Sequence, residues 1–211
     1  MLEYLETKYV PIEEDFFAGS AVEVAPRLIG CVLHHDNRGK DTAILIAEDE
    51  AYDEGDGAAH RSVSQLLPHG HAYVHRYRNM WCIDLVCGAE GQGSSVLIRA
   101  GVPVVGIDIM AERRSQAADA ERAIRERTKG YEKKLCKGPC NVGEALGLYA
   151  LLDGASLFKL PFRILRPVSP PRLLLNGPRI NVPRDTHLLW RWGHPDYRAW
   201  LSAPFPREEV A

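Results

Sequence analysis

Residues 43–52 have the sequence Ala-Ile-Leu-Ile-Ala-Glu-Asp-Glu-Ala-Tyr, an apolar run that continues directly into three carboxylates and an aromatic ring. The β-branched and aliphatic residues of this run predict a β-strand. Side chains alternate between the two faces of a strand, so one face is expected to carry Ile44, Ile46, Glu48, Glu50 and Tyr52. Carboxylates that follow core positions have two interpretations: the strand emerges into solvent, or these groups serve a chemical function.

Similar apolar runs predict further strands at residues 31–35, 72–86, 95–105, 162–168 and 188–193. Turn-forming residues separate several of these runs, and the spacing favours an antiparallel meander. A helix is predicted over Asp108–Lys129, which is rich in Ala, Glu and Arg and is followed by Gly130. A second helix is predicted to start at Asn141, with Glu144 completing a capping box, and to end at Asp153-Gly154.

The composition bounds the class of protein. The chain has 211 residues, 45% of them hydrophobic and 26% charged, which predicts one domain over residues 1–211. No stretch approaches the roughly 20 apolar residues of a membrane span, and the acidic N-terminus resembles no signal or transit peptide. Five irregularly spaced cysteines favour a reducing compartment and argue against a metal site. We therefore expect a soluble intracellular protein, cytoplasmic or nucleoid-associated in a prokaryote and otherwise nuclear.

Charge is distributed unevenly along the chain. Residues 1–60 hold 4 basic and 14 acidic side chains, whereas residues 111–198 hold 17 basic and 9 acidic side chains. This asymmetry permits a basic face that meets phosphates, although a solvated charged surface gives the same counts.

A loop of small residues follows the strand predicted at residues 43–52 and ends in His60. Together with Tyr52, this histidine could form the wall of a pocket. Asp53, Glu54 and Asp56 could also form a cation loop, but they lack the regular ligand spacing of a calcium site.

Several motifs occur in a definite order along the chain. They are Glu48-Asp49-Glu50-Ala51-Tyr52, Ala58-Ala59-His60, Gly70-His71-Ala72-Tyr73-Val74, Val96-Leu97-Ile98-Arg99-Ala100, Leu135-Cys136-Lys137-Gly138-Pro139, Glu144-Ala145-Leu146-Gly147 and Arg179-Ile180-Asn181-Val182. In this order the chain resembles the alkyladenine (3-methyladenine) DNA glycosylase family over about residues 15–202. The resemblance implies an α+β domain with a largely antiparallel, curved β-sheet flanked by helices.

The resemblance also implies an activity. Members of this family flip damaged purines, whether alkylated, deaminated or etheno-modified, out of double-stranded DNA and hydrolyse the N-glycosidic bond. Glu50 matches the general base and Arg99 the arginine that holds the attacking water and the carboxylate. No lysine stands at a matched position, so a monofunctional enzyme without cofactor or metal is expected, acting as a monomer.

The binding residues carry over in the same way. The resemblance places six residues at the base pocket: Tyr52, Ala59, His60, His75, Asp84 and Leu97. Tyr77 matches the side chain that enters the base stack if one residue is deleted before it, and an ungapped alignment places Arg78 there instead. Candidate DNA contacts are Arg61, Arg76, Arg78, Lys137 and Arg179.

Three departures from the family pattern affect the expected substrate range. Asp84 replaces an asparagine of the pocket, and an ionised Asp accepts but cannot donate hydrogen bonds. His75 stands where a second tyrosine is usual, and the loop between His60 and Gly70 is several residues shorter and lacks a basic element. Asn181 replaces a glycine, a tolerable change if the position needs positive φ.

Two other functions compete with the glycosylase. A catalytically weak lesion-binding or damage-sensing protein would keep the pocket, but it would gain nothing from a buried carboxylate near a polyanion. A metal-dependent nuclease would use Glu48, Asp49, Glu50 and His60 to hold divalent ions.

Overall fold

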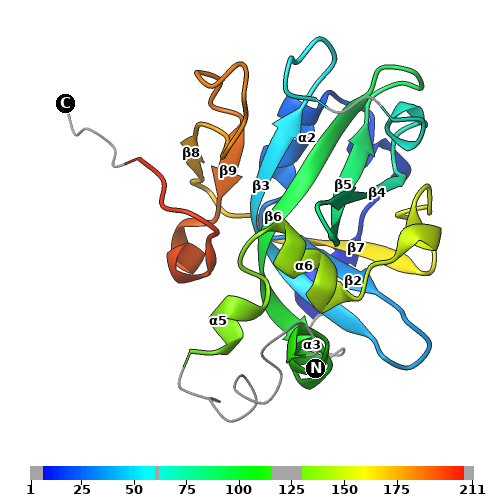
Figure 1. Ribbon diagram of the computed structural model, residues 1–211, viewed down its shortest axis with the longest axis vertical. Helices are drawn as coiled ribbons and strands as arrows, with labels where there is room; N and C mark the ends of the chain where they lie inside the picture. Colours follow the sequence, from blue (N-terminus) through cyan, green and yellow to red (C-terminus); the bar gives the residue numbers. More distant parts are fainter. Residues whose placement is uncertain (1–6, 60–61, 116–129, 207–211) are drawn as a thin grey trace.

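A curved antiparallel sheet forms the centre of the molecule in the computed structural model, which describes residues 7–59, 62–115 and 130–206 (Figure 1). Its strands are β1 (Tyr9–Pro11), β2 (Val32–His35), β3 (Thr42–Tyr52), β4 (Ala72–Tyr77), β5 (Met80–Cys87), β6 (Ser94–Val105), β7 (Phe162–Pro167), β8 (Leu175–Gly177) and β9 (Arg191–Gly193). The α-helices are α2 (Ala21–Leu28), α3 (Ile107–Ser115), α5 (Glu132–Leu135) and α6 (Pro139–Leu146). Short 3-10 helices are η1 (Glu14–Phe17), η2 (Ser64–Leu66), η3 (Ala150–Leu152) and η4 (Pro195–Trp200). The expected α+β class, with a curved sheet flanked by helices, is confirmed.

The strand order is β1-β7-β2-β3-β6-β5-β4, and β9 joins β3 while pairing with β8. Consecutive strands β4, β5 and β6 form the predicted meander, but β6 then returns beside β3 and makes the most extensive strand pairing with it. The single strand predicted at residues 72–86 is wrong, because the chain turns back at Arg78, where φ is +56°. No glycine or proline marks this turn. Of the strand predicted at residues 188–193, only the last three residues form a strand, β9.

Strand β3 changes both its partner and its inward face halfway along. Its first half pairs with β2, whereas Glu48–Glu50 pair with β9, and β6 runs along the other side. Register shifts between Ile46 and Glu48 and between Glu48 and Asp49 mark a β-bulge there. Ile44 and Ile46 therefore lie in the main core, while Glu48 and Glu50 point to the opposite face. The prediction that all five alternate residues share one face is wrong for this reason.

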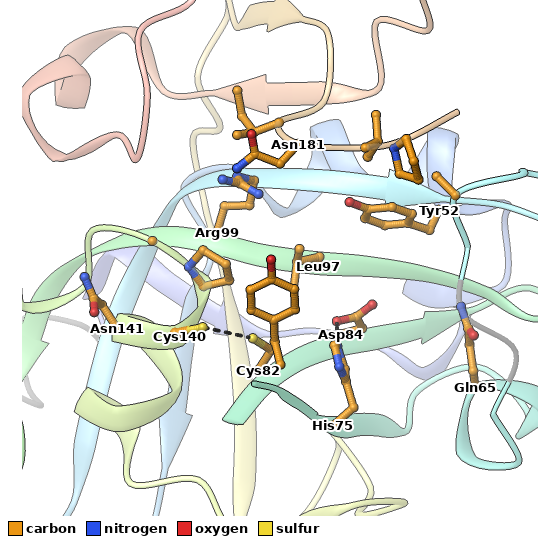
Figure 2. Close-up of a pocket in the computed structure, with 17 residues that line it drawn as sticks. Tyr52, Gln65, His75, Cys82, Asp84, Leu97, Arg99, Cys140, Asn141 and Asn181 are labelled. Atoms are coloured by element: carbon orange, nitrogen blue, oxygen red, sulfur yellow. Dashed lines mark hydrogen bonds and ion pairs between the residues drawn. The ribbon is translucent and has the colours of Figure 1, made fainter. Parts of the chain in front are cut away.

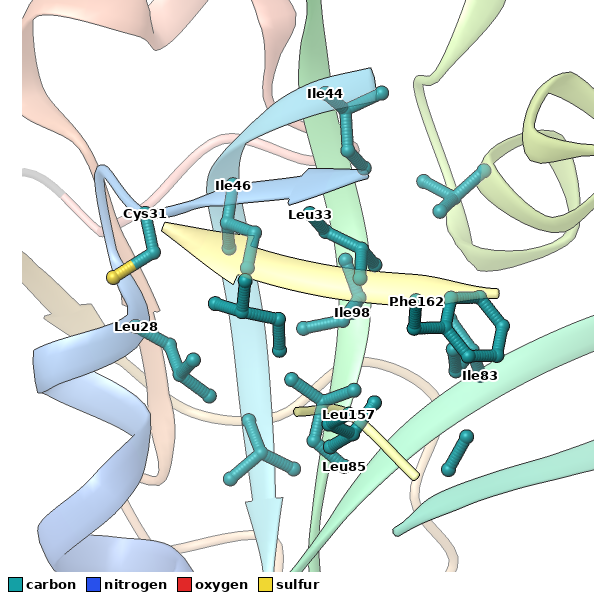
Figure 3. Close-up of a cluster of buried hydrophobic side chains, with 14 of the residues drawn as sticks. Leu28, Cys31, Leu33, Ile44, Ile46, Ile83, Leu85, Ile98, Leu157 and Phe162 are labelled. Atoms are coloured by element: carbon teal, nitrogen blue, oxygen red, sulfur yellow. The ribbon is translucent and has the colours of Figure 1, made fainter. Parts of the chain in front are cut away.

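The main hydrophobic core lies between the sheet and helices α2 and α6. Figure 3 shows side chains of β2, β3, β5, β6 and β7 meeting there with Leu28 of α2 and with Leu157. Helix α6 packs so closely on β5 that a Cβ on Gly143 would lie 1.9 Å from the carbonyl oxygen of Trp81. The absence of a side chain at Gly143 thus allows the helix to approach the sheet.

The capping box of the protein is in α2, not where the sequence placed it. Ser20 and Glu23 form it, with the Ser20 backbone amide donating to the Glu23 carboxylate at 2.9 Å. Helix α6 instead begins at Pro139, where the fixed φ of proline favours the first helical position, and ends at Gly147 in a left-handed conformation. Asn141 lies inside this helix, so its predicted role as N-cap is wrong.

The helix predicted over Asp108–Lys129 corresponds in its first part to α3. Residues 116–129 of that prediction lie outside the described residues. Within the described ranges, no helix is both long and apolar enough to span a membrane.

Asp49 is a buried carboxyl on the core side of β3. Its side chain is fully buried, and neither carboxyl oxygen has a hydrogen-bond partner among the described residues. Burial raises the pKa of Asp49 well above its ordinary value, and the charges of Glu48 and Glu50 raise it further. The carboxyl is therefore buried without a described contact that compensates for its burial.

Replacing Asp49 with Val should stabilise the protein by about 1–3 kcal/mol at pH 8, because an unpaired polar group leaves the core. A carboxyl whose pKa is higher in the folded than in the unfolded chain costs stability as pH rises above the unfolded value. The gain should therefore shrink at pH 5. Urea denaturation at both pH values measures it, with Asp49→Asn as the matched variant that keeps the shape and some of the cost. A Val variant less stable than the wild type at pH 8 would contradict this account.

Candidate active site

A cavity of about 340 Å³ opens on the face of the sheet to which Glu48 and Glu50 point. Its walls come from β3, β4, β5 and β6, from the start of α6 and from the segment 180–183 (Figure 2). The aromatic and polar side chains that matter below are Tyr52, His75, Asp84, Leu97 and Arg99. This size and this mixed lining suit a small planar ligand.

Glu50 lies directly behind the lining and contacts three of its members. The Tyr52 hydroxyl donates to Glu50 Oε2 at 2.8 Å, Arg99 Nη1 donates to the same oxygen at 3.2 Å, and the Ile180 amide donates to Oε1 at 2.6 Å. The side chain of Glu50 is fully buried. A carboxylate accepts about four hydrogen bonds, so the three bonds from the described residues leave one acceptor site, on Oε1.

The environment of Glu50 contains opposing influences on its pKa. Burial raises the pKa of the Glu50 carboxyl, and the charge of Arg99 together with the bonds from Ile180 and Tyr52 lowers it, with a net increase above 4.5. Such a group is a better proton acceptor than an ordinary carboxylate at the surface.

Arg99 is fixed between two carboxylates. Its Nε lies 3.4 Å from Glu48 Oε1, and its Nη1 bonds Glu50 on the other side. Glu48 is held in turn by Arg191 Nη1 at 3.0 Å and by the Ser202 hydroxyl at 2.8 Å. Sequence reasoning did not identify Arg191 or Ser202, because they follow the family's last motif and no spacing links them to β3.

Arg179 supports the pocket from behind. It pairs with Asp56, donates to the Ala51 carbonyl at 3.0 Å, and places its guanidinium 4.7 Å from the centre of the Tyr52 ring. Only 5% of Arg179 is exposed. This position does not fit the expectation that Arg179 contacts DNA, because the side chain is committed to the loop that follows β3.

The opposite wall carries the other expected pocket residues. His75 Nε2 lies 3.0 Å from Asp84 Oδ1, and the His75 ring stacks on Tyr73. Leu97 is half-buried in the lining. Ala59 is not among the lining residues, whereas its neighbour Ala58 is. His60 and Arg61 lie outside the described residues.

The rim of the pocket is formed partly by the β4–β5 turn. Tyr77 borders the cavity and is 49% exposed, and the Arg78 guanidinium lies 5.5 Å from the centre of its ring. Arg76 and Lys137 are also exposed. Asn181, on the other side of the opening, has φ at +56°, which confirms the reason that Asn is tolerated there.

Among the described residues, the carboxylates named for a metal-dependent nuclease do not converge. Asp49 faces the core, on the side of β3 opposite to Glu48 and Glu50. Glu48 and Glu50 are each neutralised by arginine contacts, and His60 lies outside the described residues.

Comparison with known proteins agrees with this geometry. Residues 15–198 match the sequence model of the family described as methylpurine-DNA glycosylase. Two proteins named "Putative 3-methyladenine DNA glycosylase" illustrate the similarity. One, from Rhodopseudomonas palustris, is 39% identical over 91% of this chain and 88% of the relative. The other, from Nitrosospira multiformis, is 36% identical over 92% of this chain and 95% of the relative.

These matches define the class of the protein as a DNA glycosylase of base excision repair. The chain belongs to the methylpurine-DNA glycosylase family.

Replacing Asp56 with Asn should destabilise the protein by about 3–5 kcal/mol, because the Arg179 guanidinium would stay buried without its counter-charge. Thermal and chemical denaturation measure the loss. The matched control is Asp53→Asn in the same loop, where the carboxylate accepts from the backbone amide of the next residue at 2.9 Å. If both variants are equally stable, the ion pair does not hold this wall of the pocket.

Proposed function

We propose that this protein flips alkylated, deaminated or etheno-modified purines out of double-stranded DNA and hydrolyses the N-glycosidic bond with water, leaving an abasic site. It would act as a monomer and need no metal or cofactor. The observation that carries the proposal is the buried Glu50 carboxylate, which is bonded to Arg99 directly behind an aromatic pocket.

Glu50 would act as the general base. As the purine leaves, positive charge develops at the anomeric carbon, and a nearby carboxylate stabilises that charge. The unused acceptor site on Oε1 can receive a hydrogen bond from water. The water oxygen then bonds the anomeric carbon, its proton passes to Glu50, and the electrons of the broken C–N bond leave with the purine.

Arg99 and Tyr52 would keep that carboxylate in place. Both donate to Oε2, so they fix the orientation of the group and leave Oε1 as the oxygen that serves the water. The Glu48 carboxylate fixes Arg99 from its other end. Positioning of this kind decides whether the water is in line with the bond that breaks.

Tyr52 and His75 would hold the extruded base between them, with Leu97 as an apolar contact. Alkylated purines are electron-poor or cationic, and aromatic faces attract such rings more strongly than normal bases. We expect His60 and Ala59 to complete this pocket, as the family pattern implies.

Tyr77 would enter the base stack at the flipped site, since an exposed aromatic side chain at the rim can fill the space that the base leaves. Arg76, Arg78 and Lys137 are exposed and suit phosphate contacts, and Arg61 remains a candidate from the sequence. Arg113 and Arg114 are committed elsewhere, to the carbonyl of Ala145 and to Glu144.

Single-turnover excision from duplexes that carry hypoxanthine, ethenoadenine or 7-methylguanine tests the proposal. The wild type should release base in excess EDTA and leave an abasic site. Glu50→Gln should lower the rate by at least about a hundredfold, because the amide cannot take a proton, while binding to the same duplexes is retained.

Two results would contradict the proposal. Borohydride should trap no covalent complex with DNA, so a robust adduct would indicate an amine nucleophile in place of water. A wild type that binds lesions but releases none of the three bases would favour the lesion-sensing function instead.

A further inference from the structure

The wall of the pocket opposite Tyr52 carries a histidine–carboxylate pair that the hydrolytic step does not use. Figure 2 shows the Asp84 carboxyl above His75, on the side of His75 that faces Tyr52. Asp84 belongs to β5 and is 5% exposed, and its cross-strand neighbours are Tyr73 and Leu97. A buried carboxyl that lines a ligand cavity is costly unless its contacts favour the charge.

Two side chains hold the Asp84 carboxyl in place. His75 Nε2 meets Oδ1 at 3.0 Å, and the Ser95 hydroxyl donates to Oδ2 at 3.3 Å. Ser95 is itself held by the side-chain amide of Gln65, at 3.0 Å. Two donors on two strands thus fix the carboxyl group, and its remaining acceptor sites are available to a ligand in the pocket.

His75 is one of the two described hydrogen-bond partners of this carboxyl. Burial lowers the pKa of His75, but the hydrogen bond and the charge of Asp84 outweigh burial and raise it above its ordinary value. Held by His75 and Ser95, an Asp84 carboxylate offers the pocket an oxygen that accepts hydrogen bonds and donates none. An amide at the same position would offer both a donor and an acceptor.

The edges of damaged purines differ in this respect. 7-Methylguanine carries a positive charge together with ring and exocyclic N–H donors. Ethenoadenine has lost its exocyclic amino group to the added ring, so its edge offers only acceptor nitrogens. A fixed carboxylate attracts the first kind of edge and repels the second. A closed pocket discriminates strongly against a base that leaves a buried polar group without a matching partner.

We propose that Asp84, held by His75 and Ser95, is a specificity-determining residue that selects cationic alkylpurines with N–H donors over lesions whose base edge carries only acceptors. This inference rests on the proposed glycosylase function and narrows its substrate class.

The test compares single-turnover excision of 7-methylguanine and ethenoadenine by the wild type, Asp84→Asn and Asp84→Ser. The ratio of the two rates, 7-methylguanine over ethenoadenine, should fall about tenfold or more in both variants, since a charge-assisted hydrogen bond is lost and a repulsion is removed. Comparing this ratio between each variant and the wild type cancels the intrinsic difference between the two leaving groups. Asp196→Asn, an exposed position on η4, is the matched control and should leave the ratio unchanged.

Binding gives a second readout that does not depend on turnover. In the Glu50→Gln background, loss of Asp84 should weaken binding to the 7-methylguanine duplex relative to the ethenoadenine duplex. The ratio of dissociation constants, 7-methylguanine over ethenoadenine, should therefore rise. Binding to a duplex with a reduced abasic site, which offers no base, should stay the same and shows that the variants are folded. Ratios within about threefold of the wild type would overturn the role of Asp84. Failure of the wild type to excise either lesion would instead overturn the glycosylase proposal on which it rests.

Discussion

The β-bulge in β3 determines on which side of the sheet the chemical groups lie. Before it, Ile44 and Ile46 pack into the main core, and after it Glu48 and Glu50 point to the open face, where they meet Arg99 of β6. A regular strand would bring the carboxylates into the apolar interior, at a large desolvation cost. The bulge has its own cost, because it places Asp49 in the core without a hydrogen-bond partner among the described residues.

The pocket is completed by segments far away in the sequence. The Ile180 amide bonds Glu50 across 130 residues, and Ser202 bonds Glu48 across 154 residues. Strand β9 brings Arg191 beside the same carboxylates by pairing with the second half of β3. The acidic end of one strand is thus neutralised by arginines from two others, so the site exists only when the C-terminal segments have docked on the sheet.

Alternation of apolar residues was sufficient to predict most of the sheet, and the order of the motifs was sufficient to single out Glu50 and Arg99, whose side chains the structure brings into contact. The bulge could not be predicted, because no glycine or proline of β3 marks it and it coincides with a change of partner from β2 to β9 that the sequence does not reveal. The capping box was assigned to Asn141 when Pro139 already fixed the start of that helix. Arg179 was expected to contact DNA but is buried behind the pocket, since a motif gives the residue type but not the direction of its side chain.

The central claim is that Glu50 acts as the ionised base in a pocket that raises its pKa, and the pH profile of excision tests it most directly. 7-Methylguanine is the suitable substrate because its cationic base needs no protonation to leave. The single-turnover rate of the wild type should fall as pH drops, with a midpoint above the ordinary value of 4.5, while circular dichroism shows a folded protein. The Glu50→Gln variant should be slow and flat over the same range. An acid limb that persists unchanged in that variant, or a wild-type rate that is independent of pH, would show that Glu50 is not the base.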